Sequence, residues 1–353
     1  MSLTIALDHY VYEDVYPAFK AATDEKEITA KINRAFLNYL VQRNQTLTGD
    51  APLAVADIGS GPCDTLVKYL AQVRFAPGFE VRVTDFLPAY ADAQRGEALR
   101  ILAAAQAAKT LKLAGFSAKA GNAFGGELLD LLTGPRDGSG MRCAFRIVFA
   151  SHVMYHAEGS SDVRRLLADV ANNLLAADGI CVMYHLAAAP GTFQDFRARF
   201  GSQADAARDS DTGAVTIDDP PAQIAAECAA LALPLYQADF TTSLKFARLS
   251  DNQWQSFKDP LTYERLAASD AAAYEDLKRL YFVVQRAPLE FAADHSATGL
   301  ATYIDEIRKV IEANGAALPS AETMQVFCRA DAAPRLRESI QSAVAVSIAS
   351  KDR

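Results

Sequence analysis

The chain has 353 residues, with 35 basic and 43 acidic side chains and a formal net charge of −8. This length allows about two domains, or one large domain with a cap, and 50% hydrophobic residues is typical of a folded protein with a full core. The excess of acid disfavours a broad phosphate-binding surface, so nucleic acid is not an expected partner.

Cysteine and histidine usage and the N-terminus narrow the class of protein further. Five cysteines and five histidines are scattered without a CxxC pair, so we expect neither a metal site nor a disulfide framework. The first residues carry acids where a signal peptide needs an apolar stretch, and no run reaches the roughly 18 to 20 apolar residues of a membrane span. We therefore expect a cytoplasmic protein with no membrane partner.

Two helices are predicted in the first 50 residues. An aromatic segment from Tyr10 to Phe19 ends near Ala22, and Thr23 then caps a second helix whose apolar residues recur at helical spacing as far as Leu40. A Thr-Gly-Asp-Ala-Pro break ends this helical region.

From residue 53 strands and helices alternate, which predicts a doubly wound parallel sheet. The predicted strands are 53–58, 80–84, 116–120, 145–150 and 180–186, and the predicted helices are 64–73, 89–113 and 161–175. Two later strands are predicted at 236–246 and 324–330, with mostly helical residues at 251–316 between them. Such a pair suits a sheet that finishes with a hairpin.

The sharpest motif is the turn after the first strand, with the sequence VADIGSGPCD. Asp57 lies near the end of the strand, and Gly59-Ser60-Gly61 leads directly into a helix, so the backbone can turn tightly and approach a ligand closely. A dinucleotide-binding turn continues as GxGxxG, but here Asp64 occupies the third glycine position and would repel a pyrophosphate. The turn fits a cofactor that has a carboxylate and a cation but no phosphates.

This stretch resembles the first motif of the class I S-adenosylmethionine-dependent methyltransferases. Asp85 closes the second strand where that family places the acid for the ribose hydroxyls, and Asn122-Ala123-Phe124 follow the third strand where the family contacts adenine. The resemblance implies a Rossmann-like, seven-stranded, mostly parallel sheet with S-adenosylmethionine (SAM) as cofactor. The cofactor-binding residues that it implies are Asp57, Gly59, Ser60, Gly61, Asp85, Asn122, Ala123, Phe124 and Ser151.

Over most of its length the chain is also similar, at low identity, to the histamine N-methyltransferase-like branch. The Tyr-rich segment and Ala22-Thr23-Asp24-Glu25 resemble that branch's N-terminal lid, in which an acid binds the substrate's ammonium, and Phe145–Ala157 resembles its fourth strand. His152 stands where the human-type enzyme has glutamine, so histamine itself is not the expected substrate. The resemblance implies a monomer with a helical lid at 1–50, a SAM-binding core at 51–250, a helical insert or substrate cap at 251–322, and the last strand and C-terminal helix at 323–353.

The reaction that this resemblance implies is SN2 transfer of a methyl group to a small-molecule acceptor. The candidate catalytic residues are His152, Tyr155 and Glu25, and the candidate substrate-binding residues are Tyr10, Tyr16, Glu25, His152 and His156. Two alternatives stay open. SAM can itself be the substrate of a cyclisation that releases methylthioadenosine and azetidine-2-carboxylate, or the chain can be a cofactor-binding accessory subunit without activity.

Several of these residues also have a purely structural interpretation. Asp57 can satisfy backbone groups at a strand end, and acids at 24 and 25 can stabilise a helix dipole without a ligand. The aromatic residues at 10–19 can simply dock a helix, which we favour over contact with a cation. His185, within the fifth strand, is expected to be structural.

Overall fold

The computed structural model describes two compact units, each formed by several segments of the chain. The sheet unit comprises residues 26–186, 215–240 and 322–353, and the helical unit comprises residues 1–25, 187–214 and 241–321. The backbone is described for residues 15–43, 47, 50–59, 61, 63–71, 73, 75, 77–85, 91–121, 124, 128–133, 145–154, 157, 159–200, 219–259, 261–284 and 288–351. Side chains are described for all of these except those at 43, 85, 91–94, 120, 129, 131, 133, 263, 264, 267, 268 and 288–298.

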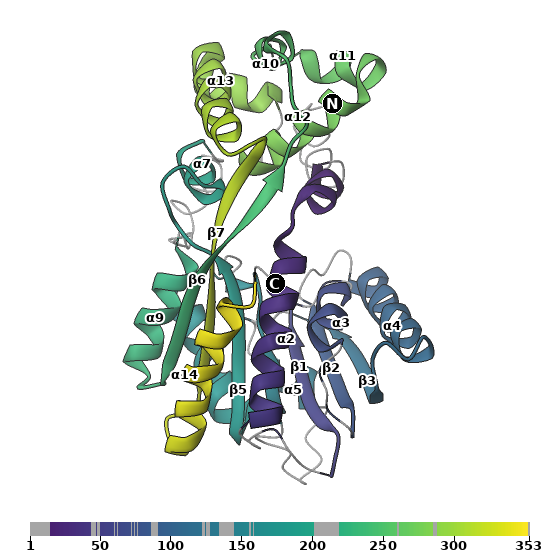
Figure 1. Ribbon diagram of the computed structural model, residues 1–353, viewed down its shortest axis with the longest axis vertical. Coiled ribbons are helices and arrows are strands. Elements are labelled where there is room, and N and C mark those ends of the chain that lie inside the picture. The colour runs from purple at the N-terminus through teal and green to yellow at the C-terminus, as the bar shows by residue number, and fades with distance from the viewer. Residues whose placement is uncertain are drawn as a thin grey trace. The chain divides into compact units, whose positions relative to one another are not determined.

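Seven strands form one mixed sheet with the order β3-β2-β1-β4-β5-β7-β6 (Figure 1). β1, β2, β3, β4 and β5 are parallel where they pair, and β7 runs antiparallel to β5. This confirms the predicted fold class, a doubly wound and mostly parallel sheet. The strands are β1 (Leu53–Ile58), β2 (Phe79–Asp85), β3 (Leu113–Ala120), β4 (Phe145–Phe149), β5 (Leu175–Leu186), β6 (Leu235–Lys245) and β7 (Ala317–Cys328).

Helices cover both faces of the sheet. Residues that alternate along a strand point to opposite faces, and they are buried here in two separate clusters. On β4, Ile147 and Phe149 belong to the larger cluster, whereas Val148 belongs to the smaller one. The larger cluster is covered by α2 (Glu25–Arg43), α3 (Asp64–Leu70), α4 (Ala91–Ala107) and α14 (Pro334–Ile348). The smaller is covered by α5 (Leu128–Thr133), α6 (Ser160–Asp169), the π-helical turn η2 (Val170–Leu174) and α9 (Pro220–Ala230).

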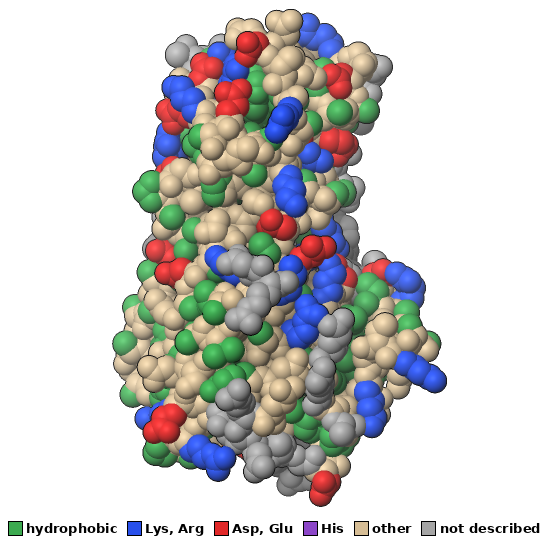
Figure 2. Space-filling model, in the orientation of Figure 1, with side chains coloured by type: hydrophobic (Ala, Val, Ile, Leu, Met, Phe, Trp, Pro, Cys, Tyr) green, Lys and Arg blue, Asp and Glu red, His purple; other side chains and the backbone are tan. Residues whose placement is uncertain are grey.

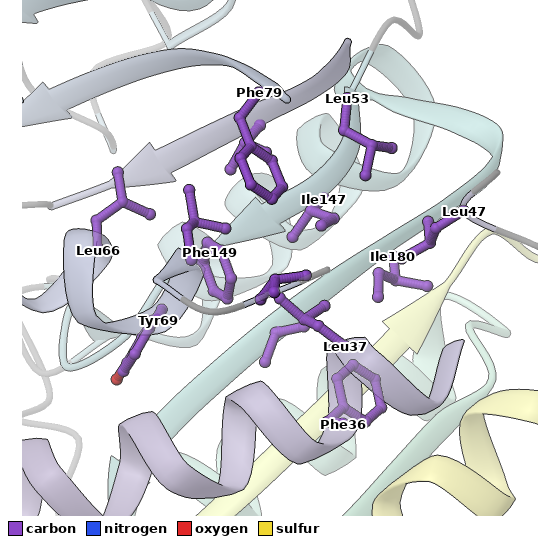
Figure 3. Packing of buried hydrophobic residues seen from close by; sticks show 14 of the residues in the cluster. Phe36, Leu37, Leu47, Leu53, Leu66, Tyr69, Phe79, Ile147, Phe149 and Ile180 are labelled. Carbon is purple, nitrogen blue, oxygen red and sulfur yellow. The ribbon is translucent and has the colours of Figure 1, made fainter. Parts of the chain in front are cut away.

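The helix predicted after Thr23 supplies the centre of the larger cluster. Ile32, Phe36, Leu37 and Leu40 of α2 are fully buried, as their helical spacing predicts. Figure 3 shows Phe36 and Leu37 pointing toward strand residues of the same cluster, among them Ile180. Burial of this stripe holds α2 against the sheet, as expected of an amphipathic helix whose stability comes from packing.

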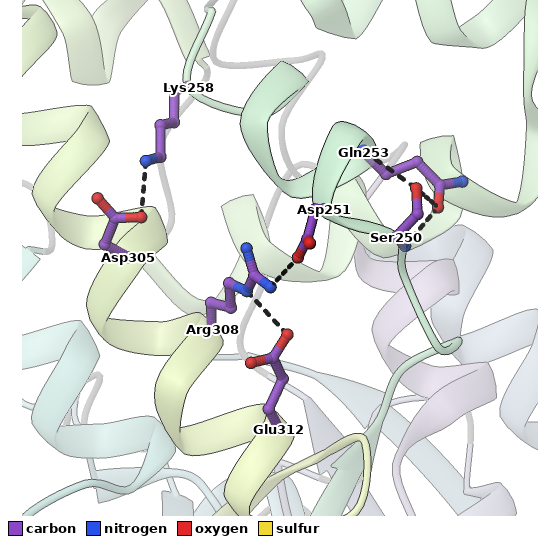
Figure 4. A network of polar contacts seen from close by, with 7 residues as sticks. All are labelled: Ser250, Asp251, Gln253, Lys258, Asp305, Arg308 and Glu312. Atoms are coloured by element: carbon purple, nitrogen blue, oxygen red, sulfur yellow. Dashed lines mark hydrogen bonds and ion pairs between the residues drawn. The ribbon is translucent and has the colours of Figure 1, made fainter.

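The helical unit contains residues 15–22 as a helix and most of the later helices, which confirms the helical prediction for 251–316. Its other helices are α7 (Phe193–Phe200), α10 (Asp251–Ser256), α11 (Thr262–Ser269), α12 (Ala271–Val284) and α13 (Pro288–Ala313). Ser250 and Gln253 form a capping box at the start of α10. Arg308 of α13 pairs with both Asp251 and Glu312 (Figure 4).

Three predicted boundaries were wrong by five residues or more, and smaller differences occur at other ends, such as β3, which begins at Leu113 and not at residue 116. The helix predicted at 89–113 ends at Ala107, because Lys109 adopts a left-handed φ of 57° and the Thr110 hydroxyl donates to the Ala105 carbonyl. β5 begins at residue 175, directly after η2, and not at residue 180. β7 begins at residue 317, and its first half (ALPSAE) lacks the apolar alternation that identified its second half.

The surface carries mixed charge. On the face drawn in Figure 2, acidic and basic side chains are intermixed. None of the helices that the structure describes is long and apolar enough to cross a membrane.

Replacing either of two glycines by alanine should change the free energy of unfolding, but in opposite directions. A Cβ on Gly179 would lie 2.5 Å from the Phe145 carbonyl oxygen, whereas a Cβ on Gly96, inside α4, would meet no atom within 4 Å. We expect Gly179→Ala to lower the free energy of unfolding by about 1–3 kcal/mol through overpacking, and Gly96→Ala to raise it by about 0.5–1 kcal/mol. Urea unfolding of both variants measures this. A Gly179→Ala protein as stable as the parent would contradict the close strand packing at this position.

Candidate functional site

The candidate site lies at the edge of the sheet where the parallel strands β1, β2 and β4 end. The strand register places Asp57 beside Val83 of β2 and beside Phe149 of β4. Ile58 is beside Thr84, so the backbone of Asp85 continues along the same edge. The Asp57 side chain is 7% exposed. Ligands of open parallel sheets bind at this edge, near the point where the strand order reverses, and here that point lies between β1 and β4.

The Gly-x-Gly turn has the backbone conformation that glycine permits. Gly59 and Gly61 have φ values of 71° and 51°, and Cys63 follows at 65°, immediately before α3. The Gly59 N–H donates to the Thr84 carbonyl at 2.8 Å, which fixes the turn to the end of β2. Residues with a Cβ are disfavoured at positive φ, so glycine at positions 59 and 61 favours this turn, and Cys63 adopts the same region at a cost.

A lysine lies at this turn that the sequence analysis missed. The Lys26 ammonium, on α2, donates to the Thr65 hydroxyl at 2.8 Å and is 4.0 Å from the Asp64 carboxylate. The charge of Asp64 is therefore accompanied by a cation. No local pattern could reveal this pair, because the two residues lie far apart in the chain and meet only through packing of α2.

Two histidines come together beyond β4. His152 has a φ of 55°, and its backbone N–H donates to the Tyr184 carbonyl of β5 at 2.9 Å. Its ring lies 6.0 Å from the His185 ring at an interplanar angle of 69°. His185 is fully buried, and neither of its ring nitrogens has a hydrogen-bond partner among the described residues. Burial removes the ring from water and lowers the pKa of His185 well below its usual value, and the electrostatic effect of the neighbouring His152 lowers it further. The His185 ring is therefore neutral at pH 7.

His185 also makes stability depend on pH. An imidazole in the unfolded chain has a pKa near 6.5, and the folded pKa of His185 is well below it. As pH falls through about 6.5, the unfolded chain takes up a proton that the folded chain does not. The free energy of unfolding then decreases by up to about 1.4 kcal/mol per pH unit. We expect urea unfolding at pH 7.5 and 5.5 to show this loss, and His185→Gln to show less of it. Equal losses in the two proteins would contradict the buried neutral state.

A buried polar chain ties three elements of the sheet unit together near the site. The Tyr184 hydroxyl donates to the Asn33 side chain at 3.4 Å, and the Asn33 amide donates to the Tyr69 carbonyl at 3.3 Å. Desolvation and then Tyr69 raise the pKa of Tyr184, so it remains a neutral phenol. These contacts join β5, α2 and α3 and keep both α2 and the glycine turn in place.

The helical-unit candidates have mostly structural contacts. The Asp24 carboxylate accepts hydrogen bonds from the Ser243 N–H and hydroxyl, each at 2.6 Å. The Phe19 and Phe282 rings stack with centroids 4.2 Å apart, and Tyr16 lies 5.8 Å from the same Phe282 ring. This is the packing role considered for the aromatic segment. Tyr16 and Glu25 belong to the helical unit, whereas Asp57 and His152 belong to the sheet unit, and the substrate roles of Tyr16 and Glu25 stay predictions.

The remaining predicted site residues are described in part or not at all. Phe124 is 6% exposed and belongs to the smaller buried cluster. The backbone of Asp85 is described, but its side chain is not. Among the residues described, no three His, Cys, Asp or Glu side chains group as metal ligands. The predicted site residues outside the described ranges are Tyr10, Ser60, Asn122, Ala123, Tyr155 and His156.

Comparison with known proteins gives only distant similarities. No family model matches the chain, and no curated protein matches it. Similar solved structures include the YcgJ protein from Bacillus subtilis, with 16% identity over 82% of this chain and 98% of that one and a TM-score of 0.40. A putative sarcosine dimethylglycine methyltransferase from Galdieria sulphuraria has 11% identity over 84% of this chain and 85% of that one, with a TM-score of 0.40.

Phosphoethanolamine N-methyltransferase 2 of Haemonchus contortus, solved with SAM, has 11% identity and a TM-score of 0.38. The match covers 82% of this chain, which spans about half of that protein at 52%. At these values the comparisons carry no argument about activity, and the fold assignment rests on the strand order of the sheet itself. The histamine N-methyltransferase-like branch stays a prediction.

Proposed function

We propose that this chain binds SAM at the ends of β1, β2 and β4 and catalyses methyl transfer to a small-molecule acceptor. One observation carries the proposal. A glycine turn at positive φ follows the buried acid Asp57 and is hydrogen-bonded to β2, in a sheet with the order β3-β2-β1-β4-β5-β7-β6. Asp85 ends β2 beside that turn.

The groups at this edge fit such a cofactor. Thr84 Oγ1 and Ser151 Oγ are buried and have no hydrogen-bond partner among the described residues, so each can bond a polar atom of a ligand. Asp57 would hold the amino group of the cofactor, and Lys26 would neutralise its carboxylate. Asp85 would accept hydrogen bonds from the ribose hydroxyls, and Asn122, Ala123 and Phe124 would contact the adenine. When bound, SAM supplies a methyl group already activated by a sulfonium.

The remaining work of the protein is alignment and proton removal. Holding an acceptor in line with the methyl group can lower the barrier by about 7 kcal/mol in the best cases. An amine acceptor reacts in its neutral form, and His152 would accept the proton that it loses. The acceptor is proposed to contact Tyr155, His156, Tyr10, Tyr16 and Glu25. We also propose that the substrate is a small molecule and that the protein acts as a monomer.

Calorimetry and product analysis test this proposal. We expect SAM and S-adenosylhomocysteine to bind. NAD should not bind, because the carboxylate of Asp64, which begins α3, would repel its pyrophosphate. With SAM and a panel of small amines, adenosylhomocysteine should form only when an acceptor is present. Methylthioadenosine formed from SAM alone would instead support the cyclisation to azetidine-2-carboxylate. Absence of SAM binding by the folded protein would overturn both reactions.

A further inference from the structure

We propose that His185 is a positioning residue for His152: its buried neutral ring accepts a hydrogen bond from His152 once His152 has taken the proton of the acceptor. The inference rests on the proposed function and adds to it a second histidine. In this step the acceptor's N–H bond breaks, its electron pair stays on the acceptor nitrogen, and a new N–H bond forms on the His152 ring. The proton then passes to solvent.

The backbone holds the two rings beside each other. His152 has the left-handed φ of 55°, which is uncommon for a residue with a side chain. Its N–H donates to the carbonyl of Tyr184, the residue immediately before His185. The resulting ring separation of 6.0 Å and angle of 69° leave no direct hydrogen bond between the rings. A small rotation of the His152 ring, or one bridging water, would join them.

His185 can act as donor or acceptor. No described residue bonds either ring nitrogen, so none of the described residues fixes the tautomer. Burial keeps the ring neutral because it lowers the pKa of His185, so a proton taken from the acceptor would stay on His152 and would not pass to His185. The neutral ring of His185 can accept a hydrogen bond at its unprotonated nitrogen and so stabilise the imidazolium of His152. Because His185 stays neutral, it adds no positive charge that would repel this imidazolium.

Acidic groups on the elements next to β5 have other partners or lie on the opposite face of the sheet. On β7 its register partner is Thr323, whose hydroxyl donates to Asp239 of β6 at 2.7 Å. Glu322 is the register partner of Leu186, so strand alternation places it on the opposite face of the sheet. Between α6 and α9, Glu227 pairs with Arg164 at 2.5 Å. After desolvation, His152 is the neighbouring group that lowers the pKa of His185.

Nuclear magnetic resonance of the protein labelled with ¹⁵N-histidine tests the pairing directly, since the chain has only five histidines. His152→Gln and His185→Gln identify the two signals by their loss. We expect the His185 nitrogens to stay neutral from pH 8.5 to 5.5 while His152 titrates. In His185→Phe the midpoint of His152 should fall by about one pH unit, a tenfold change. His185→Gln keeps an acceptor oxygen and should restore most of that shift, and Thr323→Val is the neighbouring control that should leave the midpoint unchanged.

Steady-state kinetics separate this proposal from the proposed function. In His185→Phe we expect kcat at pH 7 to fall about tenfold with SAM affinity unchanged, and the acidic limb of the kcat profile to move with the His152 midpoint. An unchanged His152 midpoint in a folded, SAM-binding His185→Phe protein would overturn the pairing alone, as would a His185 signal that titrates above pH 6. Absence of methyl transfer in the parent protein would overturn the proposed function, and the catalytic part of this inference with it.

Discussion

Asp57→Asn is expected to weaken SAM binding by about 10- to 100-fold. The carboxylate is almost fully buried at the end of β1, and a charge-assisted hydrogen bond to a ligand ammonium contributes about 1.5–3 kcal/mol. Asparagine keeps the shape of the side chain but not its charge, so the glycine turn should fold as before. Titration calorimetry with SAM measures the loss.

Glu80→Gln is the matched control for Asp57→Asn. Glu80 lies near the start of β2, at the opposite end of the same strands, and pairs with Arg82 at 3.0 Å. Its neutralisation removes the same charge from the sheet unit, and SAM affinity should stay within twofold of the parent. Equal affinity of folded Asp57→Asn and Glu80→Gln for SAM would show that Asp57 does not hold the cofactor.

Phe36→Ala is expected to lower the free energy of unfolding by about 3–5 kcal/mol. Phe36 is fully buried on α2 in the larger cluster (Figure 3), and truncation leaves a cavity beneath the helix. Urea unfolding followed by circular dichroism provides the measurement. Lys31→Ala, on the exposed side of the same helix, should change stability by less than about 0.5 kcal/mol. A loss below 1 kcal/mol for Phe36→Ala would mean that α2 is not part of the cooperative core.

Local signals in the sequence predicted most of the sheet. β1 was predicted with its observed bounds, because an apolar run there ends in a glycine turn. The early start of β5 was missed, because LAADG lacks strand character and is recruited by pairing with β4, where Phe145 lies beside Leu175. The first half of β7 was missed for a similar reason, since pairing of Glu322 with Leu186 helps to hold a segment without apolar alternation.

Some residues of the candidate site can likewise be located from the sequence, whereas others reach it only through long-range packing. Asp57 lies at the end of β1, the glycine turn follows β1, and His152 follows β4, so position along the chain places them near the ends of parallel strands. Their roles toward a ligand stay predictions. Lys26 reaches the turn only through packing of α2, and His185 meets His152 only through the pairing of β4 with β5. Long-range packing of this kind leaves no spacing pattern in the sequence.

The helix at residues 15–22 has a consequence for synthesis on the ribosome. The Ala18 carbonyl accepts a hydrogen bond from Arg279, and the Phe19 ring stacks on Phe282. Both partners lie about 260 residues later, so the helix is translated long before its docking surface exists. The aromatic segment therefore cannot dock until residues 279 and 282 have been synthesised, and closing so long a loop is a late event of folding.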